Sequence, residues 1–173
     1  MSKVSACLFC LIVPALVCAA AGHAARFNYE SEYETAPEGE SIITTGSDLR
    51  QAAALARSRG VPLLLEFSTP WCSYCVSLEE NVLEPLLRSQ EFGQHMVLRK
   101  LEITDYTRIR DFDGRMLRSD ALARNYRVDL YPTLIMFDTR GREVMRIVGI
   151  TMLESVSQQL EAALLAQRAP AVD

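Results

Sequence analysis

Two cysteines separated by two residues constrain this 173-residue chain more than any other feature of its sequence. They lie in the segment Pro70-Trp71-Cys72-Ser73-Tyr74-Cys75, which follows the apolar run 61–67 and begins a helical pattern that reaches to about residue 90. A short apolar run of this kind is typical of a buried strand. We therefore expect a strand that leads directly into a helix, with the cysteine pair in the first turn of that helix.

This placement predicts a particular chemistry for the pair. Two cysteines at this spacing in a helical turn have their sulfur atoms within bridging distance. Cys72 lies beside the helix N-terminus, where unpaired N–H groups and the helix dipole stabilise a thiolate and make it a better nucleophile. Cys75 lies one turn further in and is suited to attack a mixed disulfide from within the protein. We therefore expect thiol–disulfide exchange at Cys72 and Cys75.

A cysteine pair can also bind zinc, attach haem or form a purely structural disulfide. A zinc site usually needs four ligands, and beyond the first 25 residues only Cys72, Cys75 and His95 offer a thiol or an imidazole. Covalent haem attachment needs a histidine directly after the second cysteine, where this chain has Val76. A purely structural disulfide stays open, although a bridge across so short a loop constrains the unfolded chain little. We expect redox activity without a metal or another cofactor.

The remaining three of the five cysteines lie within residues 1–25, which have the pattern of a secretory signal peptide. A basic residue near the N-terminus precedes the apolar stretch 8–17, and residues 19–25 are rich in small side chains suited to cleavage. Cleavage would leave only the pair, in a compartment that permits disulfide chemistry. We expect a periplasmic or secreted protein, with an uncleaved N-terminal membrane anchor as the alternative.

The rest of the chain divides into three parts. Residues 26–46 carry five glutamates among polar residues and are expected to form an acidic, flexible lead-in. Residues 47–168 show the order helix, strand, helix, strand, helix, strand, strand, helix. This order predicts an α/β domain with a central mixed β-sheet, helices on both faces and an antiparallel hairpin at the end. Residues 169–173 are expected to form a C-terminal tail.

Three local signals locate features within the domain. Ser47-Asp48 offers caps for a helix over 49–59 that Gly60 ends. Pro85, inside the second helical pattern, predicts a kink or a break one turn earlier. Residues 104–119 are charged and rich in turn formers, which indicates an extended loop or a hairpin. The formal net charge of −4 gives no support for a broad basic face, so we expect no nucleic-acid partner.

With these features in place, residues 47–166 resemble the thioredoxin superfamily. Tyr131-Pro132-Thr133, just before an apolar strand, is similar to that superfamily's cis-proline loop, which lies against the active-site disulfide and pairs by backbone with the substrate. Glu66, six residues before Cys72, falls where the superfamily keeps a buried acidic group. Lys100 is similar to the lysine beside that acid, and Gly149 to the glycine after the final strand.

The resemblance implies a role for each of these residues. Cys72 and Cys75 form the active disulfide, and Glu66 takes the proton of Cys75. Trp71 shields the nucleophile. The substrate is held by that tryptophan together with Tyr131, Pro132 and Thr133.

The resemblance also implies partners and leaves the direction of exchange open. The segment 104–119 resembles an insertion, similar to that in periplasmic thioredoxin-like proteins of the SoxW and thioredoxin-related groups. Expected partners are thiols and disulfides of other proteins and, for a reductase, a membrane thiol-electron transporter. The dipeptide Ser73-Tyr74 differs from those of typical thioredoxins and of strongly oxidising periplasmic enzymes. We favour a reductase; a disulfide oxidase or isomerase and a non-catalytic peptide-binding module are the alternatives.

Overall fold

The computed structural model of the protein describes residues 41–150 and 152–168. The expected signal peptide, the expected lead-in up to residue 40 and the expected tail at 169–173 lie outside these residues. None of the helices within the described ranges is both long and apolar enough to cross a membrane.

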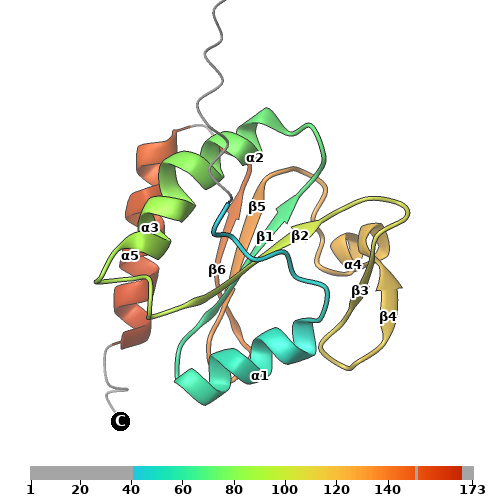
Figure 1. The fold of residues 1–173 in the computed structure, drawn as a ribbon, viewed down its shortest axis with the longest axis horizontal. Coiled ribbons are helices and arrows are strands. Elements are labelled where there is room, and N and C mark those ends of the chain that lie inside the picture. The colour runs from blue at the N-terminus through green and yellow to red at the C-terminus, as the bar shows by residue number, and fades with distance from the viewer. Residues whose placement is uncertain (1–40, 151, 169–173) are drawn as a thin grey trace, which may run out of the picture. The chain divides into compact units, whose positions relative to one another are not determined.

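A four-stranded sheet forms the centre of the domain, with the strand order β2-β1-β5-β6 (Figure 1). β1 (Leu63–Ser68) and β2 (Val97–Glu102) are parallel. β5 (Thr133–Phe137) runs antiparallel to β1, and β6 (Glu143–Val148) runs antiparallel to β5. The expected mixed sheet with a terminal antiparallel hairpin is confirmed.

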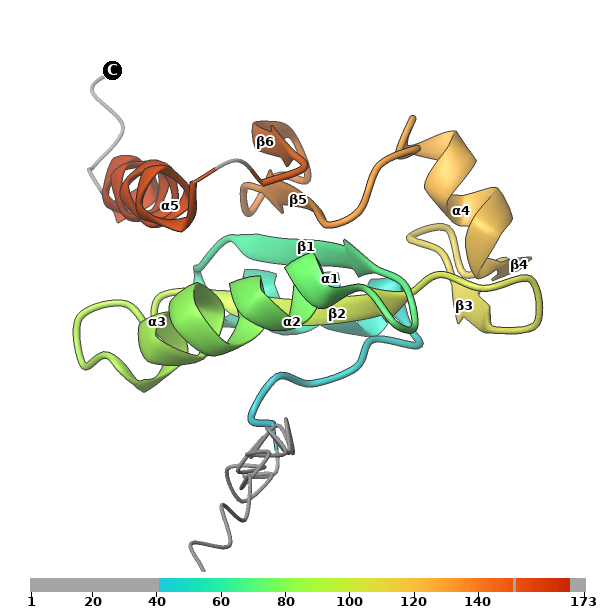
Figure 2. The same cartoon turned by 90° about the horizontal axis from the view of Figure 1, so that it is seen from above.

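Helices cover both faces of this sheet, as expected. α1 (Leu49–Arg59) packs on one face, and α5 (Leu153–Arg168) packs on the other beside the helical segment that follows β1 (Figures 1 and 2). α4 (Ser119–Asn125) lies with the inserted segment, on the side of the domain away from α5 (Figures 1 and 2). Asp48 caps α1 by accepting a hydrogen bond from the N–H of Gln51, and Gly60 ends it in the left-handed conformation.

The six residues of β1 are all buried, and they alternate between two hydrophobic clusters. Leu63, Leu65 and Phe67 join the cluster beneath α1. Leu64 joins the cluster beneath α5 and the helical segment after β1. Because alternate residues of a strand face the same side, Glu66 shares the face of Leu64. The one charged residue of β1 therefore points towards the side of the sheet that the cysteine-bearing helix covers.

The helical segment after β1 consists of three pieces: α2 (Ser73–Leu78), the π-helical turn η1 (Glu79–Leu83) and α3 (Glu84–Arg88). Pro85 lies in the first turn of α3. Proline has no N–H to donate to the carbonyl four residues earlier, so the regular α pattern cannot continue through it. The expected interruption one turn before Pro85 is confirmed, as a wider π-helical turn.

The expected boundary of the lead-in is wrong for its last residues. Ile43 is buried in the cluster beneath α5. The N–H of Lys100 on β2 donates to Thr44 O at 3.1 Å, and the N–H of Gly46 donates to Lys100 O at 2.7 Å. β2 is an edge strand of the sheet, so its outer backbone groups need partners. Residues 43–46 supply them and belong to the domain.

Within residues 104–119, the structure forms a hairpin of β3 (Arg108–Arg110) and β4 (Met116–Arg118), one of the two forms expected. Ser119 Oγ ties the hairpin back to the end of β2, because it accepts from the N–H of Thr104 at 2.8 Å and donates to Thr104 O at 2.9 Å. Phe112 in the hairpin turn packs against the cluster beneath α1. The insertion is therefore joined to the domain core.

Candidate active site

Cys72 and Cys75 form a disulfide at the start of α2, with their Cα atoms 5.2 Å apart. Cys72 is the N-cap residue, and its Sγ accepts a hydrogen bond from the N–H of Cys75 at 3.2 Å. Cys72 is partly exposed, whereas only 1% of Cys75 is exposed. A partner molecule can therefore reach Cys72 directly, and Cys75 lies behind it.

The loop between β1 and α2 presents two aromatic rings beside the disulfide. Trp71 precedes Cys72 with a φ of 63°, a left-handed conformation that is uncommon for a bulky residue. Its side chain is fully exposed, and that of Tyr74 is largely exposed. Trp71 is therefore not part of the core, and its ring is available to a partner that approaches Cys72.

The Tyr131-Pro132 loop leaves the same end of the sheet as the disulfide loop. Phe67, near the end of β1, pairs with Thr133 at the start of β5, so the two loops leave neighbouring strands. The Tyr131–Pro132 peptide bond is cis. Pro132 O accepts a hydrogen bond from the N–H of Gly149 at 2.9 Å.

Within this loop, the backbone of Tyr131 has no hydrogen-bond partner among the described residues. Thr133 Oγ1 donates to Leu130 O at 2.7 Å, and Pro132 O is bonded as described above. Neither the N–H nor the C=O of Tyr131 has a hydrogen-bond partner among the described residues. Backbone groups of this kind can pair with an extended peptide, as in β-strand addition.

Thr133, expected among the substrate-binding residues, has its side chain in the interior of the domain. Thr133 is fully buried, and its hydroxyl is used inside the loop. Thr133 begins strand β5, and its side chain projects to a covered face of the sheet rather than to the surface. Thr133 therefore fixes the carbonyl of Leu130 and the shape of the loop.

Gly149 closes the other side of this loop. Its φ is 67°, in the left-handed region that favours glycine. A Cβ atom at this position would lie 2.8 Å from Leu130 Cδ2. The absence of a side chain therefore allows the end of β6 to approach Leu130 and to bond Pro132.

Two carboxyl groups and one ammonium group share the space between the sheet and the cysteine-bearing helix. Glu66 on β1 is fully buried and is the register partner of Lys100 on β2. Glu79, the first residue of η1, is nearly buried, and its Oε1 lies 2.6 Å from Lys100 Nζ. The contact between Glu79 and Lys100 is an ion pair without the angles of a hydrogen bond. Lys100 is therefore paired directly with Glu79 and is also a neighbour of Glu66.

This arrangement favours the protonated form of Glu66. Neither of its carboxyl oxygens has a hydrogen-bond partner among the described residues. Burial raises the pKa of Glu66 to about 8; the negative charge of Glu79 adds to the increase, and Lys100 opposes it. An ordinary thiol has a pKa of about 8.5. Proton exchange between Glu66 and a thiol would therefore be nearly balanced in free energy.

Glu79 is the site residue that the sequence reasoning missed. It lies four residues after Cys75, so both side chains fall on the same side of the helical segment. That spacing was the available signal, since an acidic residue on the apolar side of a helix needs a buried partner. That partner is Lys100 on β2, so the helical segment alone could not identify it.

The described residues hold no group of three or more histidine, cysteine, aspartate or glutamate side chains placed to bind a metal ion. The groups of this site that can take part in a reaction are its two sulfur atoms and the buried carboxyl group of Glu66.

Comparison with known proteins gives a family and a fold. Residues 49–164, more than half of the chain, match the model of a thioredoxin-like domain. The thiol:disulfide interchange protein DsbD of Salmonella paratyphi A and that of Salmonella typhimurium are each 26% identical to this chain over 103 residues. The match covers 60% of this chain and only 16% of the length of either relative.

Two solved structures share the fold. One is described as DsbH oxidoreductase, with a TM-score of 0.51 and 19% identity, over 72% of this chain and 87% of the other. The second is the germline-specific thioredoxin Deadhead of Drosophila melanogaster, with a TM-score of 0.50 and 16% identity, over 69% of this chain and 98% of the other. The chain therefore belongs to the thioredoxin-like domain family, and it has the fold and the CxxC disulfide of a thiol:disulfide oxidoreductase.

Proposed function

We propose that the protein is exported and reduces disulfides in partner proteins by exchange with its Cys72–Cys75 pair. The observation that carries this proposal is the placement of the two sulfur atoms, one accessible at the start of α2 and one buried behind it. The relatives over 103 residues are named thiol:disulfide interchange proteins, which supports the same class of reaction here.

The proposed reaction begins with the reduced protein. The Cys72 thiolate attacks one sulfur of a partner disulfide, so that a mixed disulfide forms and the other partner sulfur leaves as a thiolate. The Cys75 thiolate then attacks Cys72 Sγ, which forms the Cys72–Cys75 bond and releases the second partner thiolate. Two electrons pass to the partner, and its two thiolates take up two protons.

Glu66 is the proposed acceptor of the Cys75 proton. Cys75 is buried, so its proton needs an internal route or a water molecule before the sulfur can attack. Glu66 points to the face of the sheet that α2 covers, and its pKa of about 8 lies near that of a thiol. The ionised fraction of Glu66 can therefore accept the proton without a large energetic cost.

The substrate is proposed to be an extended segment of another protein. The unpaired N–H and C=O of Tyr131 would form two backbone hydrogen bonds to it, and the exposed rings of Trp71 and Tyr74 would contact its side chains. Backbone pairing gives affinity with little sequence preference, which suits an enzyme that acts on several partners.

A reductase needs a donor of electrons, because each turnover leaves the protein oxidised. The proposed donor is a membrane thiol-electron transporter that presents a reduced dithiol on the exported side. The inserted hairpin 104–119 supports the finer assignment to the SoxW and thioredoxin-related groups, which stays a prediction.

The test of the proposed activity uses two cysteine variants. Cys72→Ser should abolish the reduction of insulin disulfides by the pre-reduced protein, and Cys75→Ser should accumulate mixed disulfides with partners at Cys72. Unchanged insulin reduction in Cys72→Ser, or no mixed disulfides with Cys75→Ser, would refute the assignment and leave a peptide-binding module.

The direction of exchange is tested separately. Equilibration of the protein with glutathione buffers gives its reduction potential. A potential near that of thioredoxin, about −270 mV, supports a reductase, whereas one near −120 mV, about that of a strong periplasmic oxidant, would make it an oxidase.

Export is tested by the N-terminus of the mature protein. Edman sequencing of protein from a periplasmic fraction should begin near residue 26. A chain that keeps residues 1–25 and stays in the membrane fraction would indicate the uncleaved anchor instead.

A further inference from the structure

A cavity of about 340 Å³ lies between α1, the hairpin turn and the turn that follows β5. Leu63, the first residue of β1, and Phe137, the last residue of β5, are register partners, and both line this cavity. The disulfide loop follows Ser68 at the other end of β1. At a rise of about 3.3 Å per residue, Leu63 lies roughly 16 Å from Ser68 along β1, whereas Tyr126, also in the lining, packs against Phe67 with ring centroids 5.9 Å apart. No residue that lines the cavity belongs to the disulfide loop or to the Tyr131-Pro132 loop.

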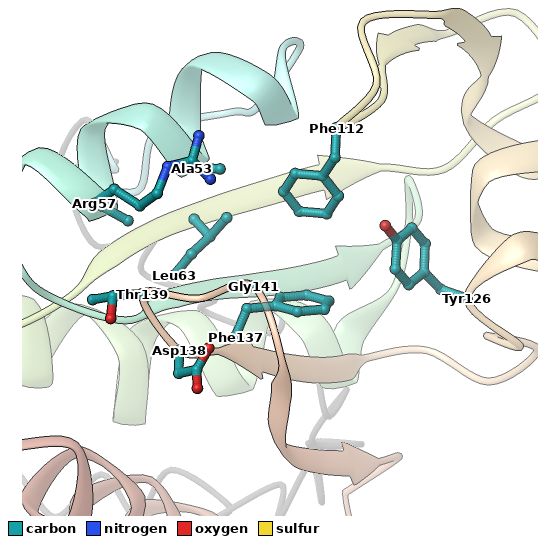
Figure 3. Close-up of a pocket in the computed structure, with 10 residues that line it drawn as sticks. Ala53, Arg57, Leu63, Phe112, Tyr126, Phe137, Asp138, Thr139 and Gly141 are labelled. Carbon is teal, nitrogen blue, oxygen red and sulfur yellow. The ribbon is translucent and has the colours of Figure 1, made fainter. Parts of the chain in front are cut away.

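Aromatic rings form one side of the cavity. Phe112, Tyr126 and Phe137 come from the hairpin turn, the end of α4 and the end of β5 (Figure 3). Their centroids lie 5.5 to 6.3 Å apart, with interplanar angles of 67° to 80°. The three rings pack edge to face against one another, and the surface that they present to the cavity is one on which another flat ring can pack.

Small residues keep the cavity open on its other sides. Ala53 on α1 and Gly141 in the turn between β5 and β6 line it. A Cβ atom added at Gly141 would meet nothing within 4 Å. A volume of this size lies in the range of pockets that hold small organic ligands, about 300 to 1,000 Å³.

The cavity has one cationic side chain and one acidic side chain, and only the cation is available. Asp138 accepts from the N–H groups of Arg140 and Arg142 and from Arg142 Nε, at 2.7 to 2.9 Å, and its side chain is only 7% exposed. Arg57, in the last turn of α1, has no ion pair and no side-chain hydrogen bond within the described part of the chain. Figure 3 shows Arg57 across the cavity from the three rings. Arg57 is therefore the charged side chain of the lining that is available to pair with a ligand.

Tyr126 adds a hydrogen-bond donor. Burial, together with the nearby carboxylates of Asp111, Asp113 and Glu143, raises the pKa of Tyr126 to about 12. The hydroxyl therefore stays protonated at neutral pH. It lines the cavity, and it has no hydrogen-bond partner among the described residues.

We propose that this cavity binds a small aromatic carboxylate. The ring of the ligand packs against the wall of the cavity that Phe112, Tyr126 and Phe137 form, and its carboxylate pairs with the guanidinium of Arg57. The proposal does not depend on the direction or the partners of the thiol–disulfide exchange, because the two sites share no residue.

The experiment compares phenylacetate with phenylacetamide, which has the same ring and no charge. Each is titrated into the full-length, ¹⁵N-labelled, oxidised protein while amide resonances are recorded. Phenylacetate should give saturable shifts in the last turn of α1, in the hairpin turn and at residues 137–141. The amide should bind about tenfold or more weakly, since a charge-assisted hydrogen bond is lost.

Two variants and one matched control test the assignment to this cavity. Arg57→Gln should weaken phenylacetate binding to the level of the amide. Arg59→Gln, two residues later on the same helix and outside the cavity lining, should leave binding unchanged. Ala53→Leu should block both ligands by filling the cavity. If Ala53→Leu does not fold, the comparison between Arg57→Gln and Arg59→Gln still shows whether phenylacetate binds at Arg57.

Three results would overturn the proposal: no saturable binding of phenylacetate, equal affinities for the acid and the amide, or equal effects of Arg57→Gln and Arg59→Gln. Insulin reduction should be unaffected by Arg57→Gln, which separates this inference from the proposed function.

Discussion

Replacing Glu66 by glutamine should change how the stability of the protein depends on pH. The pKa of Glu66 is raised from 4.5 to about 8 in the folded protein, mainly by burial. Between these values the folded chain holds a proton that the unfolded chain has lost, so the free energy of unfolding falls as pH rises. The stabilisation is complete below pH 4.5 and has been lost once pH exceeds about 8. Because one pKa unit corresponds to about 1.4 kcal/mol, the difference of about 3.5 units (8 minus 4.5) amounts to at most about 5 kcal/mol.

Urea unfolding of the oxidised protein at several pH values measures this effect. The stability of Glu66→Gln relative to the wild type should increase by about 1.4 kcal/mol per pH unit between about pH 5 and pH 8 and then level off. A buried amide without partners adds a constant offset, so the slope is the informative quantity. Glu80→Gln, at an exposed position next to Glu79, is the control and should follow the wild type. A flat difference for Glu66→Gln would show that Glu66 ionises alike in the folded and unfolded chains, and the argument from burial would be wrong.

Three further changes test the surroundings of the disulfide. Glu79→Gln should lower the pKa of Glu66 towards 4.5, because a neighbouring negative charge disappears; ¹³C NMR of the Glu66 carboxyl group measures this, and an unchanged or higher pKa would contradict it. Gly149→Ala should cost about 1–2 kcal/mol in urea unfolding, because an alanine at a φ of 67° is strained and its Cβ crowds Leu130; unaltered stability would argue against that strain. Thr133→Val should cost about 1 kcal/mol, because Leu130 O loses its hydrogen bond, and should slow insulin reduction; a variant with wild-type stability and rate would mean that the loop does not need this bond.

The parts of the fold that the sequence predicted are those set by local patterns. The apolar run before the cysteine pair, the cap at Asp48 and the stop at Gly60 each act within a few residues. Pro85 disrupts the helix within one turn, for a reason contained in proline itself. The spacing of Cys72 and Cys75 likewise sets which sulfur atom is exposed, since one helical turn separates them.

Predictions failed or were incomplete where the outcome depended on a partner distant in the chain. Residues 43–46 directly follow an acidic, polar segment and were grouped with it. They join the domain because Ile43 packs in the core and the edge of β2 offers unpaired backbone groups. For Thr133 the resemblance implies contact with the substrate but does not say which of its groups is exposed. The packing of the sheet faces buries its side chain, and its hydroxyl bonds Leu130 O.

By itself, then, the sequence determined the chemistry of the two sulfur atoms and the alternation of helices and strands, because both follow from residues close together in the chain. Only the tertiary structure decided that Glu66, Glu79 and Lys100 share one buried space, since they come from β1, η1 and β2. It alone also created the cavity beside Arg57, whose walls come from α1, the hairpin turn, α4 and the turn after β5. The periodicity of a segment shows which face is buried, but strand register and helix packing decide which side chains meet there.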